Sequence, residues 1–139
     1  MSFLGKELES VAKQLGIGVG LLLVIQVSYE ICASCTSIVA HDENEIPFHV
    51  RIMDWMIPLL KQFTIEVDFR RNKKTVYKAT TWAGYIGILT GMKPNKFSVS
   101  VNFREVGESK LKNLWKSITG GWPVGYLVRM NLEQADSYE

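Results

Sequence analysis

Regularly spaced apolar residues predict a helix at the start of the chain. Its apolar positions recur with the spacing of one helical face, and the charged residues lie elsewhere around the helix: the apolar set is Leu4, Leu8, Val11, Ala12 and Leu15. Gly16 and Gly18 end the helix. A second helix, almost wholly apolar, is predicted from Val19 to Glu30. Because it is apolar on every side, we expect it to be buried inside something larger.

From Cys35 onward, β-prone runs replace the helical pattern. The segment Cys35 to Ala40 predicts a short strand, and a polar turn separates it from a second strand that ends near Arg51. Pro47 falls in this second strand, where it cannot donate a ladder hydrogen bond.

Strict alternation of apolar and polar residues marks the clearest strand, Phe63 to Phe69. A charged turn from Arg70 to Lys74 joins it to a partner strand, Thr75 to Trp82. The same alternation recurs from Phe97 to Phe103. Between these strands lies the glycine-spaced segment Ala83 to Gly91, which lacks a dinucleotide-binding order and is expected to mark a bend or a close backbone approach.

Two further helices are predicted after the strands. An apolar stripe from Leu111 to Ile118 has helical spacing, and Pro123 suits the first turn of the last helix. Helices, then antiparallel strands, then helices predict an α+β fold, a single domain in which helices flank an antiparallel sheet.

Composition narrows the possible partners. The 139 residues suffice for a sizeable core, and 47% hydrophobic and 22% charged residues are ordinary for a globular protein. A net charge of +2, without a basic stripe interleaved with aromatic residues, gives no reason to expect a nucleic-acid partner. The apolar run Gly16 to Val27 is shorter than the ~20 residues of a spanning helix, and we expect no targeting signal in this chain.

The two cysteines form a C-x-x-C pair, Cys32 and Cys35. This spacing occurs in half-zinc sites and redox modules, but the second ligand pair and the βαβ context that these need are missing. His41 and His49 lie nearby without a recognisable ligand spacing. We therefore expect no metal and no cofactor. Cys32 is expected to be buried, and an inert buried thiol remains an alternative for Cys35.

The segment Cys35-Thr36-Ser37-Ile38-Val39-Ala40 is the most specific feature of the sequence. It resembles the segment that opens the catalytic subunit in the family of acid ceramidase and N-acylethanolamine acid amidase. Further segments resemble this family in the same order along the chain: Ser28–Glu30, His49–Asp54, Ala83–Gly87, Leu89–Gly91, Lys93–Pro94 and Tyr126–Arg129.

The resemblance implies an N-terminal nucleophile hydrolase, a four-layer αββα sandwich that cleaves itself before its nucleophile. Here the bond would be Ser34–Cys35, so that residues 1–34 are a helical remnant of the small subunit and 35–139 the N-terminal part of the catalytic subunit. The freed α-amino group, whose reference pKa is about 7.7–8.0, can take the thiol proton. One residue then supplies both nucleophile and base.

Two more active-site residues follow from the resemblance. Arg51 would favour the Cys35 thiolate by its charge, and Asp54 would orient the amine and the substrate. A surface Arg–Asp pair at i, i+3 is the alternative for these two residues.

The chain departs from the family in the same region. Val50 and Ile52 stand where the family has Gly and Asn, and Phe103 stands at an acidic position. A β-branched residue would be strained if that Gly holds a positive φ. These changes favour the alternative of a catalytically inactive truncated paralogue or gene fragment. The family's back half, which the resemblance does not cover, supplies an oxyanion donor, and losing one costs about 10²–10³ in rate.

The implied substrates are lipid amides, either N-acylethanolamines or ceramide, with a free fatty acid and an amine as products. The short connection from Trp55 to Gln62 slightly favours the acylethanolamine branch, whereas Met53 and the Asp68 to Val76 hairpin look more like the ceramidase branch. The family implies a lysosomal location. Contact with a lipid surface, and self-association through the apolar helix, are the expected further interactions.

Overall fold

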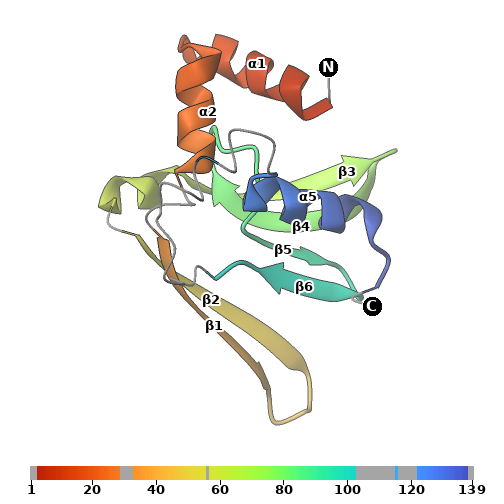
Figure 1. Ribbon diagram of the computed structural model, residues 1–139. Helices are drawn as coiled ribbons and strands as arrows, with labels where there is room; N and C mark the ends of the chain where they lie inside the picture. Colours follow the sequence, from red (N-terminus) through yellow and green to blue (C-terminus); the bar gives the residue numbers. More distant parts are fainter. Residues whose placement is uncertain (1–2, 29–32, 56, 103–114, 116–121, 138–139) are drawn as a thin grey trace.

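The computed structural model describes residues 3–28, 33–55, 57–102, 115 and 122–137, arranged as helices and antiparallel strands (Figure 1). The helix expected from Leu111 to Ile118 lies outside the described residues except for Trp115, and Cys32 and Phe103 also lie outside them.

The first two helices are α1 (Phe3–Leu15) and α2 (Val19–Val27). α1 ends where predicted because Gly16 adopts a φ of 68°, a left-handed conformation that glycine takes without steric cost. α2 begins at the predicted Val19, and its described part ends at Val27.

In this chain α2 is only partly covered, which leaves open apolar surface of the kind expected to drive self-association. Leu22, Gln26 and Val27 are buried, but Leu21 is 56% exposed and Val24 is 60% exposed. Only one face of α2 packs against described residues, on α1 and the segment after β4. Taken alone, no described helix is long and apolar enough to cross a membrane, whereas α1 and α2 together, bent by 111°, reach that length and composition.

A separate two-stranded hairpin follows, formed by β1 (Ala33–His41) and β2 (Pro47–Trp55). Asp42 shapes its turn, since its Oδ1 accepts hydrogen bonds from the amides of Asn44 and Ile46, both at 2.8 Å. Backbone bonding to Ile46 is the main reason that the pKa of Asp42 is lowered. Pro47 is tolerated because it is the first residue of β2, and the strand continues past the predicted end to Trp55.

The second sheet has four antiparallel strands in the order β3-β4-β5-β6. A short 3-10 helix, η1 (Pro58–Phe63), precedes them, so that Phe63 belongs to η1 and not to the predicted strand. The strands are β3 (Thr64–Arg71), β4 (Lys74–Trp82), β5 (Thr90–Lys93) and β6 (Phe97–Ser100). β5 was not expected from the sequence.

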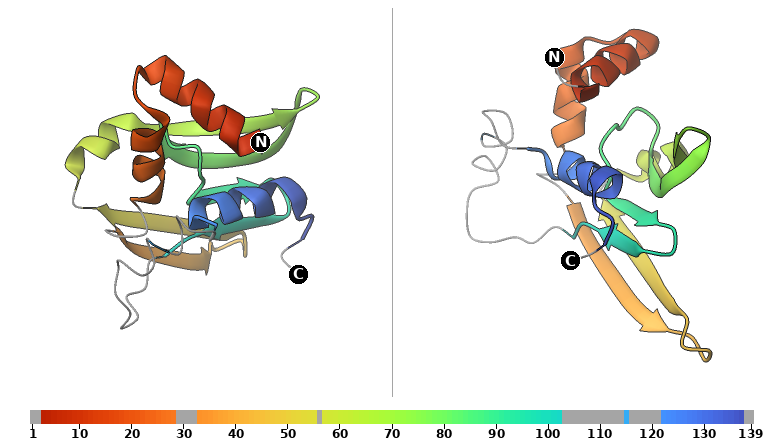
Figure 2. Two further views of the ribbon diagram at one scale, coloured as in Figure 1. Left: turned by 45° about the horizontal axis from the view of Figure 1, so that its top comes forward. Right: turned by 90° about the vertical axis from the view of Figure 1, so that its right-hand side faces the viewer.

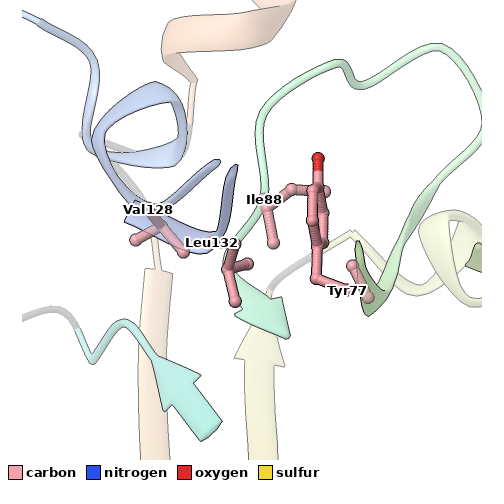
Figure 3. Packing of buried hydrophobic residues seen from close by; sticks show 5 residues of the cluster. Tyr77, Ile88, Val128 and Leu132 are labelled. Atoms are coloured by element: carbon pink, nitrogen blue, oxygen red, sulfur yellow. The ribbon is translucent and has the colours of Figure 1, made fainter. Parts of the chain in front are cut away.

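α5 (Val124–Gln134) covers one face of this sheet, and the β1–β2 hairpin lies toward the other (Figure 2). The core between α5 and the sheet is apolar, and Figure 3 shows it from close by: Tyr77, Ala79, Ile88, Val128 and Leu132. Gly91 allows this packing, since a Cβ there would lie 2.6 Å from Cδ1 of Leu132. The α+β architecture with helices flanking an antiparallel sheet is thus as predicted.

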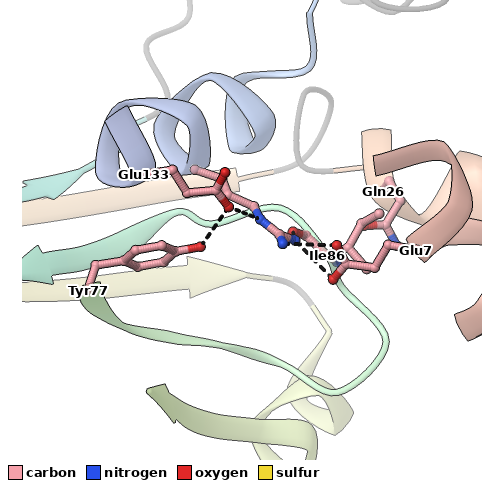
Figure 4. A network of polar contacts seen from close by, with 6 residues as sticks. Glu7, Gln26, Tyr77, Ile86 and Glu133 are labelled. Atoms are coloured by element: carbon pink, nitrogen blue, oxygen red, sulfur yellow. Dashed lines mark hydrogen bonds and ion pairs between the residues drawn. The ribbon is translucent and has the colours of Figure 1, made fainter. Parts of the chain in front are cut away.

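Arg129 of α5 is 5% exposed and joins three parts of the chain, whose contacting residues Glu7, Ile86 and Glu133 are labelled in Figure 4. Its Nε donates to Glu133 at 3.0 Å, its Nη1 donates to the carbonyl of Ile86 at 2.8 Å, and its Nη2 lies 2.9 Å from Glu7 of α1. The guanidinium carbon also lies 5.2 Å from the centre of the Phe69 ring. Burial works against the charge, but the hydrogen bonds that Arg129 donates to Glu7 and Glu133 outweigh it and raise the pKa of Arg129.

Gln26 provides a second link between α2 and the segment after β4. Its side chain is buried, with Nε2 donating to the carbonyl of Gly84 at 2.9 Å and Oε1 accepting from the amide of Ile86 at 2.8 Å. The side-chain amide thus takes the place of a neighbouring strand along this irregular segment.

Alkaline pH is expected to destabilise the protein through its buried tyrosines. Burial is the main cause that raises the pKa of Tyr126 to about 12, and burial also raises the pKa of Tyr77. An unfolded tyrosine loses its proton near pH 10. The folded chain therefore holds protons that the unfolded chain releases, so stability falls as pH rises from about 10 to 12. Circular dichroism and tyrosinate absorbance should change together there, and Tyr126→Phe should make the decline shallower.

Candidate active site

The pairing of β1 with β2 brings two of the three candidate residues to the same face of the hairpin. Cys35 is opposite Met53, and Ser37 is opposite Arg51. Since every second residue of a strand faces the same way, Cys35 and Arg51 share a face. Nη2 of Arg51 donates a hydrogen bond to Sγ of Cys35 at 2.9 Å.

Arg51 also reaches the four-stranded sheet. Its Nη1 donates to the hydroxyl of Thr90 at 3.0 Å, and its Nη2 donates to the carbonyl of Val101 at 2.8 Å. Thr90 begins β5, and Val101 directly follows β6. The guanidinium is therefore held in one orientation while it contacts the thiol, as a positioned cationic donor would be.

An apolar wall lies against the half-buried thiol. Cys35 and Met53 pack against the buried side chains of Tyr85 and Leu89. Trp82 meets Tyr85 edge to face, with the ring centres 5.5 Å apart. Trp82 belongs to β4, and Tyr85 and Leu89 belong to the glycine-spaced segment after it. This segment forms a bend between β4 and β5, as expected.

A cavity of about 320 Å³ opens beside Arg51, between the hairpin and the sheet. Its lining includes polar groups, Thr81 and Thr90, and the apolar side chains of Met53 and Leu89. A cavity of about 700 Å³ adjoins it along the hairpin, and the two have His49, Thr80 and Thr90 in common. Apolar walls with a few polar groups are typical of small-molecule sites.

Asp54 lies on the other face of the hairpin and is exposed. Residues three apart on a strand point to opposite faces, so the alternative of a surface Arg51–Asp54 pair does not fit β2. Asp54 is paired directly with Ser34, the residue before the candidate nucleophile. The structure thus places Asp54 beside the Ser34–Cys35 bond by register, but not beside the thiol or Arg51.

The two departures in β2 do not distort the backbone around Arg51. Val50 lies within the regular strand and has no positive φ, so the strain expected for a β-branched residue there does not arise. Ile52 is 50% exposed, and alternation places it on the face of Asp54, away from the thiol.

Sequence reasoning missed both groups that orient Arg51. Thr90 lies in the Leu89–Gly91 segment that resembles the family, so a signal for it was present. The carbonyl of Val101 had none, because any residue supplies a carbonyl. Among the described residues, no three His, Cys, Asp or Glu side chains gather as metal ligands would.

Comparison with known proteins gives consistent relatives, although no family model matches the chain. It is 37% identical over 152 aligned residues to acid ceramidase of Heterocephalus glaber, covering 96% of this chain and 38% of that protein. It is 33% identical to an uncharacterised protein of Acanthamoeba polyphaga mimivirus, covering 96% of this chain and 44% of that protein. The chain thus spans less than half the length of these relatives.

A solved structure agrees with the sequence relatives. The Caenorhabditis elegans ortholog of N-acylethanolamine-hydrolyzing acid amidase superposes with a TM-score of 0.63 at 36% identity, covering 77% of this chain and 45% of that one. The expected fold, part of an αββα sandwich of the N-terminal nucleophile hydrolase type, is thereby confirmed. Together with the acid ceramidase matches, this likeness identifies the chain as a partial-length member of the acid ceramidase and N-acylethanolamine acid amidase family.

Proposed function

We propose that this chain carries the nucleophile of a cysteine amide hydrolase that acts on N-acyl lipids. The observation that carries the proposal is the 2.9 Å hydrogen bond from Arg51 to the Cys35 thiol, at an apolar wall and beside a cavity. A cationic donor at a half-buried thiol stabilises the thiolate, which is the nucleophilic form of cysteine. The relatives' names, acid ceramidase and N-acylethanolamine-hydrolyzing acid amidase, supply the substrate class.

Maturation would begin with attack of the Cys35 sulfur on the carbonyl carbon of Ser34. The peptide C–N bond breaks as the thioester forms, and the nitrogen takes the thiol proton to become the α-amine of Cys35. Water then hydrolyses the thioester, leaving a carboxylate on Ser34 and a thiol on Cys35. Cleavage would divide the chain into residues 1–34 and 35–139.

Lipid hydrolysis would follow the same chemistry with an external amide. The α-amine takes the proton of the Cys35 thiol, the sulfur attacks the acyl carbon, and the amine product leaves with that proton. Water releases the fatty acid from the acyl thioester. Arg51 stabilises the thiolate, and Asp54, paired in register with Ser34, orients the new amine.

Expression of the intact chain with mass measurement tests this proposal. We expect a product that begins at Cys35 in the unaltered protein and only the uncut chain in Cys35→Ala, because the variant has no sulfur to form the thioester. Cys32→Ala is the matched control and should be cut normally. An uncut chain in a folded, unaltered protein would contradict the proposal.

A catalytically inactive paralogue is the second candidate. Two observations favour it: β1 runs as a regular strand through the Ser34–Cys35 bond, and the Asp54 side chain faces away from the thiol. A folded chain that stays uncut and does not hydrolyse a fluorogenic N-acyl amide at acidic pH would favour this candidate.

The relatives leave both substrate branches open. Acid ceramidase is among the sequence relatives, whereas the structural neighbour is an N-acylethanolamine-hydrolyzing acid amidase. η1 makes the connection between β2 and β3 compact, a feature that we associate with the acylethanolamine branch. We also propose a lysosomal location, on the basis of the family alone.

The exposed face of α2 is expected to drive self-association. Leu21, Val24 and Ile25 are 56%, 60% and 45% exposed, and neighbouring apolar side chains of this kind associate with one another or with lipid. Val24→Glu should shift light scattering toward the monomer, whereas Gln14→Glu, the same change of charge on an exposed site of α1, should not. A stable monomer in the unaltered protein would contradict this expectation, and binding to lipid vesicles would identify a lipid surface as the partner.

A further inference from the structure

A chain of side-chain hydrogen bonds ties the hairpin to β6 on the face that carries Cys35. His49 of β2 contacts two serines, through Nδ1 to the hydroxyl of Ser98 at 2.9 Å and through Nε2 to the hydroxyl of Ser100 at 3.1 Å. The Ser100 hydroxyl lies 2.8 Å from that of Ser37 in β1, and Ser37 donates to Oδ1 of Asn102 at 2.9 Å.

Counting the protons along this chain fixes its direction. Each serine hydroxyl has one proton to donate. Ser37 donates its proton to Asn102, so the proton between Ser37 and Ser100 comes from Ser100. Ser100 then has no proton for His49, and Nε2 of His49 must be the donor in their contact. The chain therefore requires the Nε2–H form of His49.

At the other end of this series of hydrogen bonds, the bond between His49 and Ser98 can run in either direction. When His49 is neutral, its Nδ1 accepts the Ser98 proton; when His49 is charged, its Nδ1 donates and the Ser98 oxygen accepts. Ser98 is exposed, so its hydroxyl can turn. Both protonation states keep every hydrogen bond of the chain.

This chain of hydrogen bonds lies where it would position the nucleophile. His49 lies two residues from Arg51 on the same face of β2, and Ser37 lies two residues from Cys35 on the same face of β1. Ser100 is paired with Thr90, which accepts from Arg51. Displacing the hairpin from β6 would move Cys35 and Arg51 away from the contacts that orient them.

We propose that His49 is a positioning residue, which in its Nε2–H form fastens the nucleophile hairpin to β6 at both neutral and acidic pH. Its role in catalysis rests on the proposed function. The joint, meaning the hydrogen bonds that link His49 and Ser37 to Ser98, Ser100 and Asn102, does not. The charged groups around His49 are Arg51 on β2 and, across the adjoining cavity, Glu66 and Asp68 of β3 and Lys78 of β4.

Nitrogen NMR of the histidine rings in the full chain tests the joint directly, with the exposed His41 as internal control. At neutral pH we expect His49 in the Nε2–H form alone, with an observable ring N–H proton, and His41 as a mixture of tautomers. His49 should keep its ring N–H signal when the sample is made acidic. An Nδ1–H form, or a mixture like that of His41, would overturn the proposal.

Variants test what the joint holds. Ser100→Ala removes the acceptor of Nε2–H, and we expect amide hydrogen exchange in β2 to become about tenfold faster or more, from the loss of two hydrogen bonds. The rate at which iodoacetamide labels Cys35 should also change in Ser100→Ala. Thr75→Ala, in β4 but outside both the hydrogen-bond chain and the cavities beside Arg51, should alter neither rate. His49→Gln should keep amide exchange in β2 slow, whereas His49→Phe should make it faster.

The outcomes separate this inference from the proposed function. An Nε2–H signal and exchange protection in a chain that stays uncut would support the joint and contradict the hydrolase proposal. A chain cut at Cys35 with unchanged exchange in Ser100→Ala would support the hydrolase and overturn the role of His49.

Discussion

Replacing Arg129 with methionine is expected to lower the free energy of unfolding by about 2–3 kcal/mol, because it leaves two partly buried carboxylates without their partner. Arg129 is 5% exposed, and it bonds Glu7, Glu133 and the carbonyl of Ile86. Methionine fills similar volume, so the loss would come from charge and hydrogen bonding rather than from a cavity. The midpoint of urea unfolding, followed by circular dichroism, measures it.

Two further variants decide whether unpaired carboxylates cause that loss. Arg129→Met combined with Glu7→Gln should recover part of the stability, since one of the stranded charges is then gone. Arg70→Met removes an exposed arginine paired with Asp68 and should change stability by no more than about 1 kcal/mol. A loss in Arg129→Met as small as that in Arg70→Met would contradict the role assigned to this network.

Replacing Arg51 with methionine is expected to slow iodoacetamide labelling of Cys35 by about tenfold to a hundredfold. The guanidinium donates to the sulfur at 2.9 Å, and hydrogen bonds to charged groups contribute about 1.5–3 kcal/mol. In the unaltered chain, Cys35 should also react faster than Cys32. Peptide mapping after limited labelling measures both cysteines in one sample.

Arg71→Met is the control for Arg51→Met, because it removes the same charge from an exposed site on the β3–β4 hairpin. Its labelling rate should equal that of the unaltered chain. Thr90→Val removes one of the groups that orient Arg51 and should give an intermediate rate. Equal rates in Arg51→Met and the unaltered chain would mean that the guanidinium does not activate the thiol, and preferential labelling of Cys32 would argue against Cys35 as the nucleophile.

Local patterns in the sequence predicted the elements whose one apolar face meets the core. The alternation in β3 and β6 and the spacing in α1 are of this kind, and the order of elements indicated the α+β class. β5 escaped prediction because Gly91 carries no side chain, and its place in the sheet depends on close contact with Leu132 of α5. Which face of α2 is covered could not be predicted, since periodicity reports how apolar a helix is but not what covers it.

The candidate site was predictable only in part. The resemblance to the family pointed to Cys35 and Arg51, and the structure places them in contact. Strand periodicity explains why Asp54 lies on the opposite face of β2 from Arg51, because residues three apart on a strand point to opposite faces. The serines that meet His49 lie 49 and 51 residues away from it in sequence, and such pairings arise only once β6 and the hairpin come together.

The pairing of β1 with β2 across the scissile bond has a consequence for what happens after cleavage. Ala33 is paired with Trp55 and Ser34 with Asp54, so a cut before Cys35 would leave the residues of the new chain end paired in the sheet, next to the new amine. Held there, the released end has a high effective concentration at the site, where it can religate or block lipid entry. Maturation would then have two kinetic phases, bond cleavage and the peeling of residues 33–34 from β2, and the second would control when the thiol becomes accessible to substrate.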